Sequence, residues 1–309
     1  MLRYTLKRVM EMIPTTFGIV LVTFLLFNVV GGSPAETVLG KNATKEAIAA
    51  FNHKWGYDKP LVWSLDSQFV NFVVSAAKGD FGYSTELNEP VASILKRGVL
   101  PSLSLTVPIL AGGSAIALML ATVSAQFRGG AADKAILGVS TVLMSVNYVV
   151  WVLAGQFFFS YKLGVFPVWG YEGAVYLVLP VAIGILSSLG TDVRFFRTAI
   201  LDEIYKPYVL TARAKRLSKT RILFSHVLPN ALIPIVTYIS LSIPWLFTGS
   251  LLLESFFGIP GLGSVSINAI HSADMAVVRT LVLLGALLYQ LVNLAADVAY
   301  AWIDPRVRL

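Results

Sequence analysis

Long apolar runs separated by polar and basic segments form the main pattern of this chain. Six runs are long enough to cross the hydrocarbon core of a bilayer, which takes about 20 residues of helix. The apolar residues are continuous within each run and do not alternate with polar ones, which excludes an outer-membrane β-barrel. We therefore expect an all-α polytopic membrane protein with six transmembrane helices. Their approximate ranges are 9–31, 101–125, 135–160, 174–193, 231–253 and 277–302.

The composition agrees with a membrane protein and removes several kinds of site. Of 309 residues, 56% are hydrophobic and 13% are charged, whereas about 25% are charged in a soluble domain. The chain has no cysteine, so disulfides, thiolate metal sites and cysteine nucleophiles are ruled out. His53, His226 and His271 lie far apart and lack metal-ligand spacing. We expect no metal site and no cofactor in this chain.

The basic residues predict the orientation in the membrane. With the N-terminus inside, 15 of the 24 Lys and Arg residues fall in inside segments. Seven of the other nine lie in one long loop, and long loops are translocated largely regardless of charge. Both termini are therefore expected in the cytoplasm, and the net charge of +7 needs no nucleic-acid partner to explain it.

The order of these segments gives a predicted organisation. The first apolar run is longer than a signal-peptide core and no A-x-A cleavage site follows it, so we interpret 1–32 as a retained transmembrane helix. Residues 33–100 form an external loop in which aromatic and polar residues alternate at helical intervals, which indicates short amphipathic helices. Residues 101–309 form a core of five transmembrane helices that includes a basic loop at 203–229.

The chain lacks the motifs of several enzyme classes. It contains no phosphate-binding G-x-x-x-x-G-K-[ST] loop, no H-E-x-x-H and no G-x-S-x-G. Asp297 is taken as the only acidic residue well inside a span, whereas proton-coupled carriers usually bury several ionisable groups. The residues therefore indicate a non-catalytic membrane protein, and they disfavour a secondary carrier.

The basic loop at 203–229 contains the candidate functional segment. Residues 208–218 read Y-V-L-T-A-R-A-K-R-L-S. Helical spacing places one set of residues toward one side, Thr211, Ala212, Lys215, Ser218 and Lys219, and another set on a second side, Leu210, Ala214 and Leu217. Small residues let a helix approach a partner closely, and the basic residues can pair with acids on that partner. A solvated basic loop that only obeys the charge rule is the alternative. Pro229 is expected to mark the start of the next span.

Several motifs, in the same order, resemble those of bacterial ABC importer permeases of the dipeptide, oligopeptide and nickel branch. The segment 208–218 is similar to the E-A-A-x-x-x-G signature of that family. Arg216 stands at the glycine position of the signature and Leu210 at its leading acidic position. Arginine there is expected to favour a different turn or a longer helix. Further similar segments are L-R-Y-T-L-K-R (2–8), I-P-T (13–15), G-G-S-P-A (31–35), Y-D-K-P (57–60), G-D-F-G-Y-S (79–84), L-P-S-L-S-L (100–105), L-G-V-F-P-V-W-G-Y (163–171), E-S-F-F-G-I-P-G-L-G (254–263), V-N-L-A-A-D (292–297) and D-P-R-V-R (304–308).

The resemblance implies a type I importer permease in the bacterial plasma (inner) membrane. Its partners would be a second related permease, two cytoplasmic ATPases that use ATP and Mg²⁺, and an external solute-binding protein. Dipeptides, oligopeptides, nickel chelates, glutathione and antimicrobial peptides all remain possible substrates. An ATP-independent carrier and a membrane scaffold or receptor remain the alternative functions. The implied ATPase-coupling residues are Tyr208, Thr211, Ala212, Arg213, Ala214, Lys215, Arg216, Leu217, Ser218 and Pro229.

Polar and aromatic residues within the spans are candidates for a translocation pathway, with helix packing as the alternative for each. These pathway candidates are Asn147, Trp151, Ser242, Trp245, Ser250 and Glu254. Glu254 is expected at the outer surface, where it contacts a substrate amine or the binding protein, or else fixes the loop that follows. Asn293 and Asp297 lie four residues apart on one helix face, which predicts a hydrogen bond to a neighbouring helix.

Overall fold

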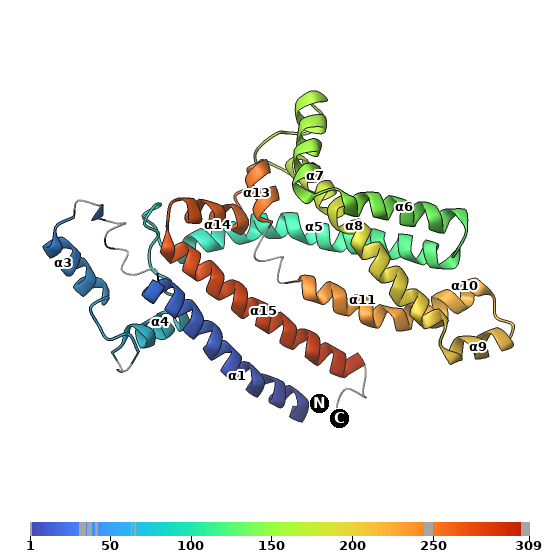
Figure 1. The fold of residues 1–309 in the computed structure, drawn as a ribbon, viewed down its shortest axis with the longest axis horizontal. Coiled ribbons are helices and arrows are strands. Elements are labelled where there is room, and N and C mark those ends of the chain that lie inside the picture. Colours follow the sequence, from blue (N-terminus) through green and yellow to red (C-terminus); the bar gives the residue numbers. More distant parts are fainter. Residues whose placement is uncertain are drawn as a thin grey trace. The chain divides into compact units, whose positions relative to one another are not determined.

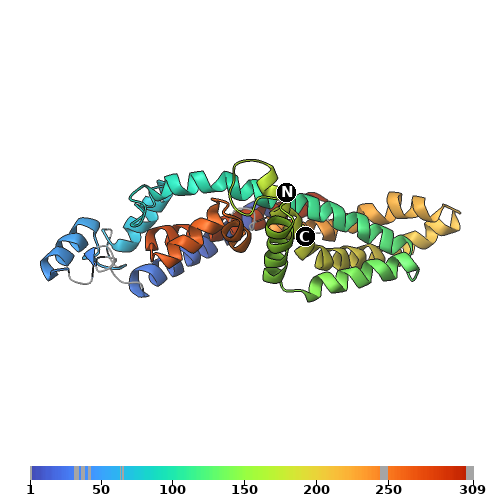
Figure 2. The same cartoon turned by 90° about the horizontal axis from the view of Figure 1, so that it is seen from above.

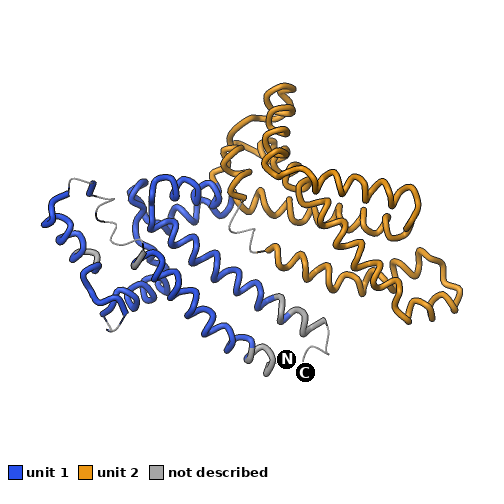
Figure 3. Tube along the Cα trace, viewed as in Figure 1, with its two compact units in different colours: residues 1–100, 261–309 blue, residues 101–260 orange. Residues whose placement is uncertain are grey.

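The computed structural model describes residues 2–30, 35, 39–40, 43–62, 64, 66–243 and 250–303. They form two compact units, Met1–Leu100 with Gly261–Leu309 and Pro101–Pro260, coloured blue and orange in Figure 3. Apart from one isolated bridge between Tyr83 and Pro90, the regular structure of the described residues is helical. The predicted all-α class is therefore confirmed, whereas the division at 32 and 100 rests on the sequence alone.

The first unit, Met1–Leu100 with Gly261–Leu309, is built around two long helices, α1 and α15, which run side by side in Figures 1 and 2. Gln290 joins them, because its amide donates to the Met12 carbonyl at 2.9 Å and its carbonyl accepts from Thr16 at 3.1 Å. Such polar contacts hold helices together in lipid, where burial of apolar area gives no advantage. The elements of this unit are α1 (Leu2–Phe24), the π-helical η1 (Leu25–Val30), α3 (Lys45–Trp55), α4 (Gln68–Ala77), the first turns of α5 (Val91–Gln126), α14 (Leu262–His271) and α15 (Met275–Ile303).

The predicted helices of the external loop are present as α3 and α4. Thr44 and Ser67 cap them by accepting hydrogen bonds from the backbone of Ala47 and Val70, each at 3.2 Å, as N-cap hydroxyls commonly do. On α4, the ring of Phe69 lies 5.3 Å from that of the fully buried Phe24. The described part of this loop therefore packs against α1 through α4.

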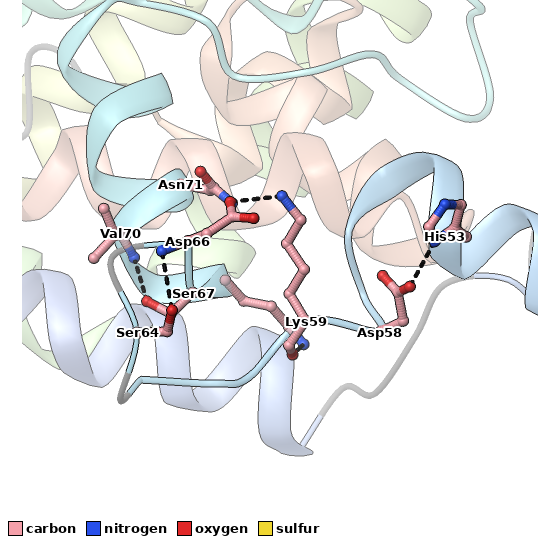
Figure 4. A network of polar contacts seen from close by, with 9 residues as sticks. His53, Asp58, Lys59, Ser64, Asp66, Ser67, Val70 and Asn71 are labelled. Atoms are coloured by element: carbon pink, nitrogen blue, oxygen red, sulfur yellow. Dashed lines mark hydrogen bonds and ion pairs between the residues drawn. The ribbon is translucent and has the colours of Figure 1, made fainter.

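Short polar contacts hold the segment between α3 and α4 (Figure 4). Lys59 and Asn71 both donate to Asp66, at 2.6 and 3.3 Å, and His53 donates to Asp58 at 2.7 Å. The bonds from Lys59 and Asn71 lower the pKa of the Asp66 carboxyl, and the bond from His53 lowers that of Asp58. Both carboxylates therefore remain charged at neutral pH.

The second unit, Pro101–Pro260, is organised around α8, against which α6 and α11 pack. A Cβ on Gly190 of α8 would lie only 2.6 Å from the Ser140 carbonyl of α6, so this glycine permits the close approach of the two helices. The elements of this unit are the rest of α5, α6 (Ala131–Ser145), α7 (Tyr148–Gly155), the π-helical η2 (Gln156–Lys162), α8 (Val175–Ile204), α9 (Pro207–Ala214), α10 (Lys219–Ile222), the π-helical η3 (Leu223–Val227), α11 (Leu228–Ser242) and α13 (Leu251–Phe257).

Five helices of the described part are long and apolar enough to cross a membrane: Arg8–Asn28, Val91–Gln126, Val175–Ile204, Lys219–Ser242 and Met275–Ala295. Two further pairs of segments, Ala131–Ser145 with Tyr148–Lys162 and Leu251–Phe257 with Leu262–His271, are each bent at a short break. Each pair is long and apolar enough to cross a membrane only if its two parts are counted as one span, which gives up to seven spans. The expected number of six falls within this range. Two helices extend beyond the predicted spans, because α5 begins at Val91 and the helix that ends at Ser242 begins at Lys219.

The predicted span at 135–160 is not one continuous helix. The helix breaks at Val146 and Asn147, and its two parts meet at 91°. Both residues have extended backbones, and the Asn147 side chain accepts from the backbone of Val149 at 2.9 Å. Asparagine favours this N-cap position, so a local hydrogen bond starts a new helix inside an apolar run.

Candidate functional site

The basic loop folds into two short helices, α9 and α10, joined by a tight turn. Lys206 is extended and Pro207 occupies the first turn of α9, where its fixed φ and missing N–H suit a helix start. After α9 ends at Ala214, Ser218 caps α10 by accepting from the backbone of Arg221 at 3.3 Å. The helical spacing expected from Leu210 to Lys219 is therefore interrupted between Ala214 and Lys219, and we call residues 206–221 the elbow.

The turn of the elbow depends on Arg216, which has φ of 57°. This is the left-handed conformation that glycine commonly supplies at a helix end, so the arginine keeps the glycine-like geometry. The expectation that it would favour a different turn or a longer helix is wrong. A non-glycine residue pays about 1–2 kcal/mol for this conformation, and the surrounding caps at Lys215 and Ser218 maintain it.

One side of α9 is buried in the protein's own core. Val209 is 0% exposed and Ala212 is 7% exposed, and both belong to a cluster with Ile200 of α8 and Leu223. Ala212 therefore does not face a partner, which corrects the face assigned to it from helical spacing. The side chains of α9 and the following turn that face outward are Leu210, Thr211, Arg213, Ala214, Lys215 and Arg216.

Tyr208 fastens α9 to the end of α8. Its hydroxyl donates to Glu203 at 2.7 Å, and burial together with the Glu203 charge raises the pKa of Tyr208 to about 12. The guanidinium of Arg128 lies 5.2 Å from the ring of Tyr205, where α8 ends. The elbow is thus attached to α8 by polar and apolar contacts.

The elbow presents a strongly basic surface. None of its Lys and Arg side chains has a carboxylate within 4.0 Å among the residues that the structure describes. Uncompensated charge on an exposed helix is suited to an acidic protein surface. The basic residues of the elbow, all exposed, are Lys206, Arg213, Lys215, Arg216, Lys219 and Arg221.

Two further coupling candidates have local roles. Leu217 is partly buried against the same core cluster as Ala212. Pro229 lies in the first turn of α11, but the chain is already helical from Lys219. The π-helical turn Leu223–Val227 precedes this proline. Pro229 therefore does not mark the start of the helix, and its place at the membrane border stays a prediction.

Most of the described pathway candidates have partners within their own unit. Glu254 is 0% exposed, accepts from the Ser102 hydroxyl at 2.8 Å and accepts from the Ser250 backbone at 3.1 Å, which favours the structural alternative over contact with a solute or a binding protein. The hydroxyls of Ser250 and Tyr148 lie 3.1 Å apart. Trp151 is partly buried against the core around Val152. These side chains hold α5, α7 and α13 together.

The remaining candidates give less information. The Ser242 hydroxyl donates to the Tyr238 carbonyl of its own helix at 3.5 Å, and Trp245 lies outside the described residues. Asn293 is partly buried in α15, and the side chain of Asp297 lies outside the described residues. The bond expected from these two residues to a neighbouring helix stays a prediction.

The structure brings together two polar pairs that the sequence did not single out. Arg197 pairs with the buried Asp133 at 2.9 Å, and Tyr238 donates to Asp192 at 2.9 Å. Asp192 lies within α8, so Asp297 is not the only acidic residue well inside a membrane helix. The signal was present in the sequence as an acidic residue in an apolar run, but the span was expected to end at 193.

Comparison with known proteins identifies the class to which this fold belongs. The family model described as "Binding-protein-dependent transport system inner membrane component" matches residues 113–309. The N-terminal model of the same kind of transport system matches residues 1–106. The chain therefore belongs to the family of binding-protein-dependent transport system inner membrane components.

Relatives match the chain over its full length. The glutathione transport system permease protein GsiC of Shigella flexneri serotype 5b is 31% identical over 311 residues, which cover 100% of this chain and 99% of that protein. The GsiC proteins of Escherichia coli K12 and Salmonella typhimurium LT2 are 30% and 31% identical over 310 residues, with the same coverage. The chain is thus a multi-pass permease component of a type I ABC importer, a non-catalytic membrane subunit.

Proposed function

We propose that this permease couples to a cytoplasmic ATPase through α9 and the turn that follows it. The observation that carries the proposal is the division of α9 into a side buried with α8, through Val209 and Ala212, and an outward side bearing Leu210 and Arg213. A partner that pushes on the outward side moves α8 and α11 with it, because close-packed cores transmit displacement. The elbow is therefore suited to convert closure of an ATPase into movement of membrane helices.

The basic surface of the elbow favours an acidic cleft on that ATPase. Six exposed Lys and Arg side chains without described ion-pair partners would steer the encounter and fix its orientation more than they would add affinity. Leu210, 62% exposed at the surface of α9, would supply an apolar contact in the cleft. The coupling role would put the elbow on the cytoplasmic side of the bacterial plasma membrane, and the distribution of basic residues favours the same side for both chain termini.

The complete importer would contain four further subunits. A second, related permease would form the translocation pathway together with this chain, and two ATPases would bind ATP and Mg²⁺. An external solute-binding protein would deliver the cargo. The relatives named for glutathione transport support a small peptide or a peptide-like solute as the cargo of this chain.

Reconstitution of the complex tests this function. The tagged chain is purified from its native membrane with its partners, which mass spectrometry identifies, and placed in proteoliposomes. A loaded binding protein is expected to stimulate ATP hydrolysis and solute uptake. Leu210→Glu is expected to abolish the stimulation while the other subunits still assemble. The matched control is Leu87→Glu, at an external position of similar exposure, 55%, which should retain the stimulation.

The alternatives predict different outcomes. An ATP-independent carrier would take up solute without ATPases and would respond to ionophores. A scaffold or receptor would purify with a cytoplasmic partner that has no ATPase activity. Either result would contradict the coupling role of the elbow.

A further inference from the structure

A strip of polar side chains lies on α8 and α11 of the second unit, and we call Ser188, Thr191, Asp192 and Tyr238 the polar strip. The Tyr238 hydroxyl donates to the Asp192 carboxylate at 2.9 Å, and Ser188 lies one helical turn before Asp192 on α8. Thr191 is exposed, and Asp192 is partly exposed. A carboxylate therefore reaches the surface of two helices that are long and apolar enough to cross a membrane.

The polar strip lies within two apolar helices, toward the basic end of α8. Asp192 precedes Arg194 by two residues and Arg197 by five, about 3 and 7.5 Å along the helix. Tyr238 follows His226 by twelve residues, about 18 Å along the same helical stretch. Both helices thus carry the strip within a stretch that is long and apolar enough to cross a membrane.

Lipid is an unsuitable neighbour for this carboxylate. An ionised aspartate within a membrane helix is costly in lipid, and such residues face a bundle interior or a water-filled cavity. It accepts from the neutral hydroxyl of Tyr238, and no Lys or Arg of the described residues lies within 4.0 Å of it. Asp133, by contrast, is neutralised by Arg197.

The aromatic side chains around Tyr238 fix its position. The ring of Phe195 stacks on that of Tyr238 with centroids 4.4 Å apart, and the buried Phe196 meets the same ring edge-on at 5.9 Å. The hydroxyl is therefore aimed at Asp192 before any solute arrives. Phe195 remains 39% exposed beside the strip, and aromatic faces of this kind also attract cations.

We propose that the polar strip lines the water-filled translocation pathway and that Asp192 contacts the positively charged ammonium group of the passing solute. A carboxylate accepts hydrogen bonds and an ammonium group only donates them, so the two are complementary. The inference rests on the proposed function, since peptides and peptide-like solutes carry such an ammonium group. It adds the pathway surface and the charge that the cargo meets.

Single cysteines test the pathway surface without background, because the chain has no cysteine of its own. Thr191→Cys, on the strip, is compared with Leu186→Cys on the same helix, which is 38% exposed, and with the buried Val193→Cys. Each variant is reacted in the assembled complex with a water-soluble, cationic methanethiosulfonate reagent. Thr191→Cys is expected to react at least about tenfold faster than both controls, because lipid and protein cores suppress the thiolate. Equal rates at the three positions would overturn the pathway assignment.

A second measurement tests the charge. Thr191→Cys is reacted with a cationic and an anionic methanethiosulfonate reagent, with Asp192 present and with Asp192→Asn. Loss of the carboxylate is expected to lower the ratio of cationic to anionic rate by about three- to tenfold. An unchanged ratio would overturn the ammonium contact. Both readouts are independent of ATP hydrolysis, so a failure of the proposed function appears separately, as a complex that the loaded binding protein does not stimulate.

Discussion

The guanidinium of Arg197 donates to both oxygens of the buried carboxylate of Asp133, with both N–O distances at 2.9 Å. The backbone of Gly129 donates to the same carboxylate at 2.8 Å, and Ser124 donates to it at 2.5 Å. These contacts join the end of α5 and the start of α6 to α8, the helix that leads into the elbow. A displacement of α8 would therefore carry the α5–α6 turn with it.

Removal of the arginine is expected to leave an unpaired buried charge. Arg197→Met should lower the free energy of unfolding by about 3–5 kcal/mol, as broken buried ion pairs do. Asp133→Leu added to Arg197→Met should recover most of that loss, because no charge then remains uncompensated. Thermal unfolding of the detergent-solubilised protein, followed by circular dichroism, measures both. A loss below about 1 kcal/mol in the single variant would contradict the role of the pair.

Because Arg216 has a left-handed backbone, its replacement by glycine is expected to change stability in the opposite direction to the same replacement at Arg213. Arg216→Gly is expected to raise stability by up to about 1 kcal/mol, since glycine adopts positive φ without steric cost. Arg213→Gly, three residues earlier inside α9, should lower it by about 1 kcal/mol. The melting temperature of each variant, compared with that of the native protein, measures the two changes in stability. Changes of the same sign would mean that Arg216 is not strained.

Tyr208 is expected to contribute stability that depends on pH. Its folded pKa of about 12 lies above the ordinary value of 10.0, so the contribution is complete below pH 10 and is lost as the pH rises toward 12. Tyr208→Phe should cost about 1–2 kcal/mol at neutral pH, through the lost bond to Glu203. The difference in stability between the native protein and this variant, followed from pH 8 to 12, should shrink only in the alkaline range. A difference that shrinks toward acid pH would refute the assignment.

Gly258 is expected to tolerate no side chain. A Cβ at this position would lie 2.2 Å from the ring of Trp169, and its φ is +68°. Gly258→Ala should displace the tryptophan and shift its fluorescence. Adding Trp169→Ala removes the steric clash and should leave a cost of about 1–2 kcal/mol from the backbone conformation alone. Unchanged emission and melting temperature in Gly258→Ala would contradict the contact.

The parts of the fold that the sequence predicted are those that the bilayer dictates. Apolar runs of about 20 residues predict membrane helices because backbone polar groups must be satisfied inside lipid. The break at Asn147 escaped the prediction because a capping side chain changes the geometry without changing the apolar count. The inward direction of Ala212 escaped because the face of a short helix depends on where the helix begins, which Pro207 decides.

The polar pairs depend on contacts between distant parts of the chain. Asp192 and Tyr238 are 46 residues apart, and Asp133 and Arg197 are 64 apart. Hydropathy places each residue near a membrane border but does not indicate which helices pack together. The family was predictable for the opposite reason, because its motifs are local and keep their order.

The most direct test of the coupling role compares two alanines of α9. Ala214 is exposed and Ala212 is 7% exposed, and each is replaced by cysteine in this cysteine-free chain. A maleimide–benzophenone crosslinker is attached in native membranes, and the photoproducts are identified by mass spectrometry. The account predicts that Ala214→Cys crosslinks to an ATPase with a phosphate-binding loop and that Ala212→Cys does not. A crosslink from Ala214→Cys to another kind of protein, or to none, would contradict it.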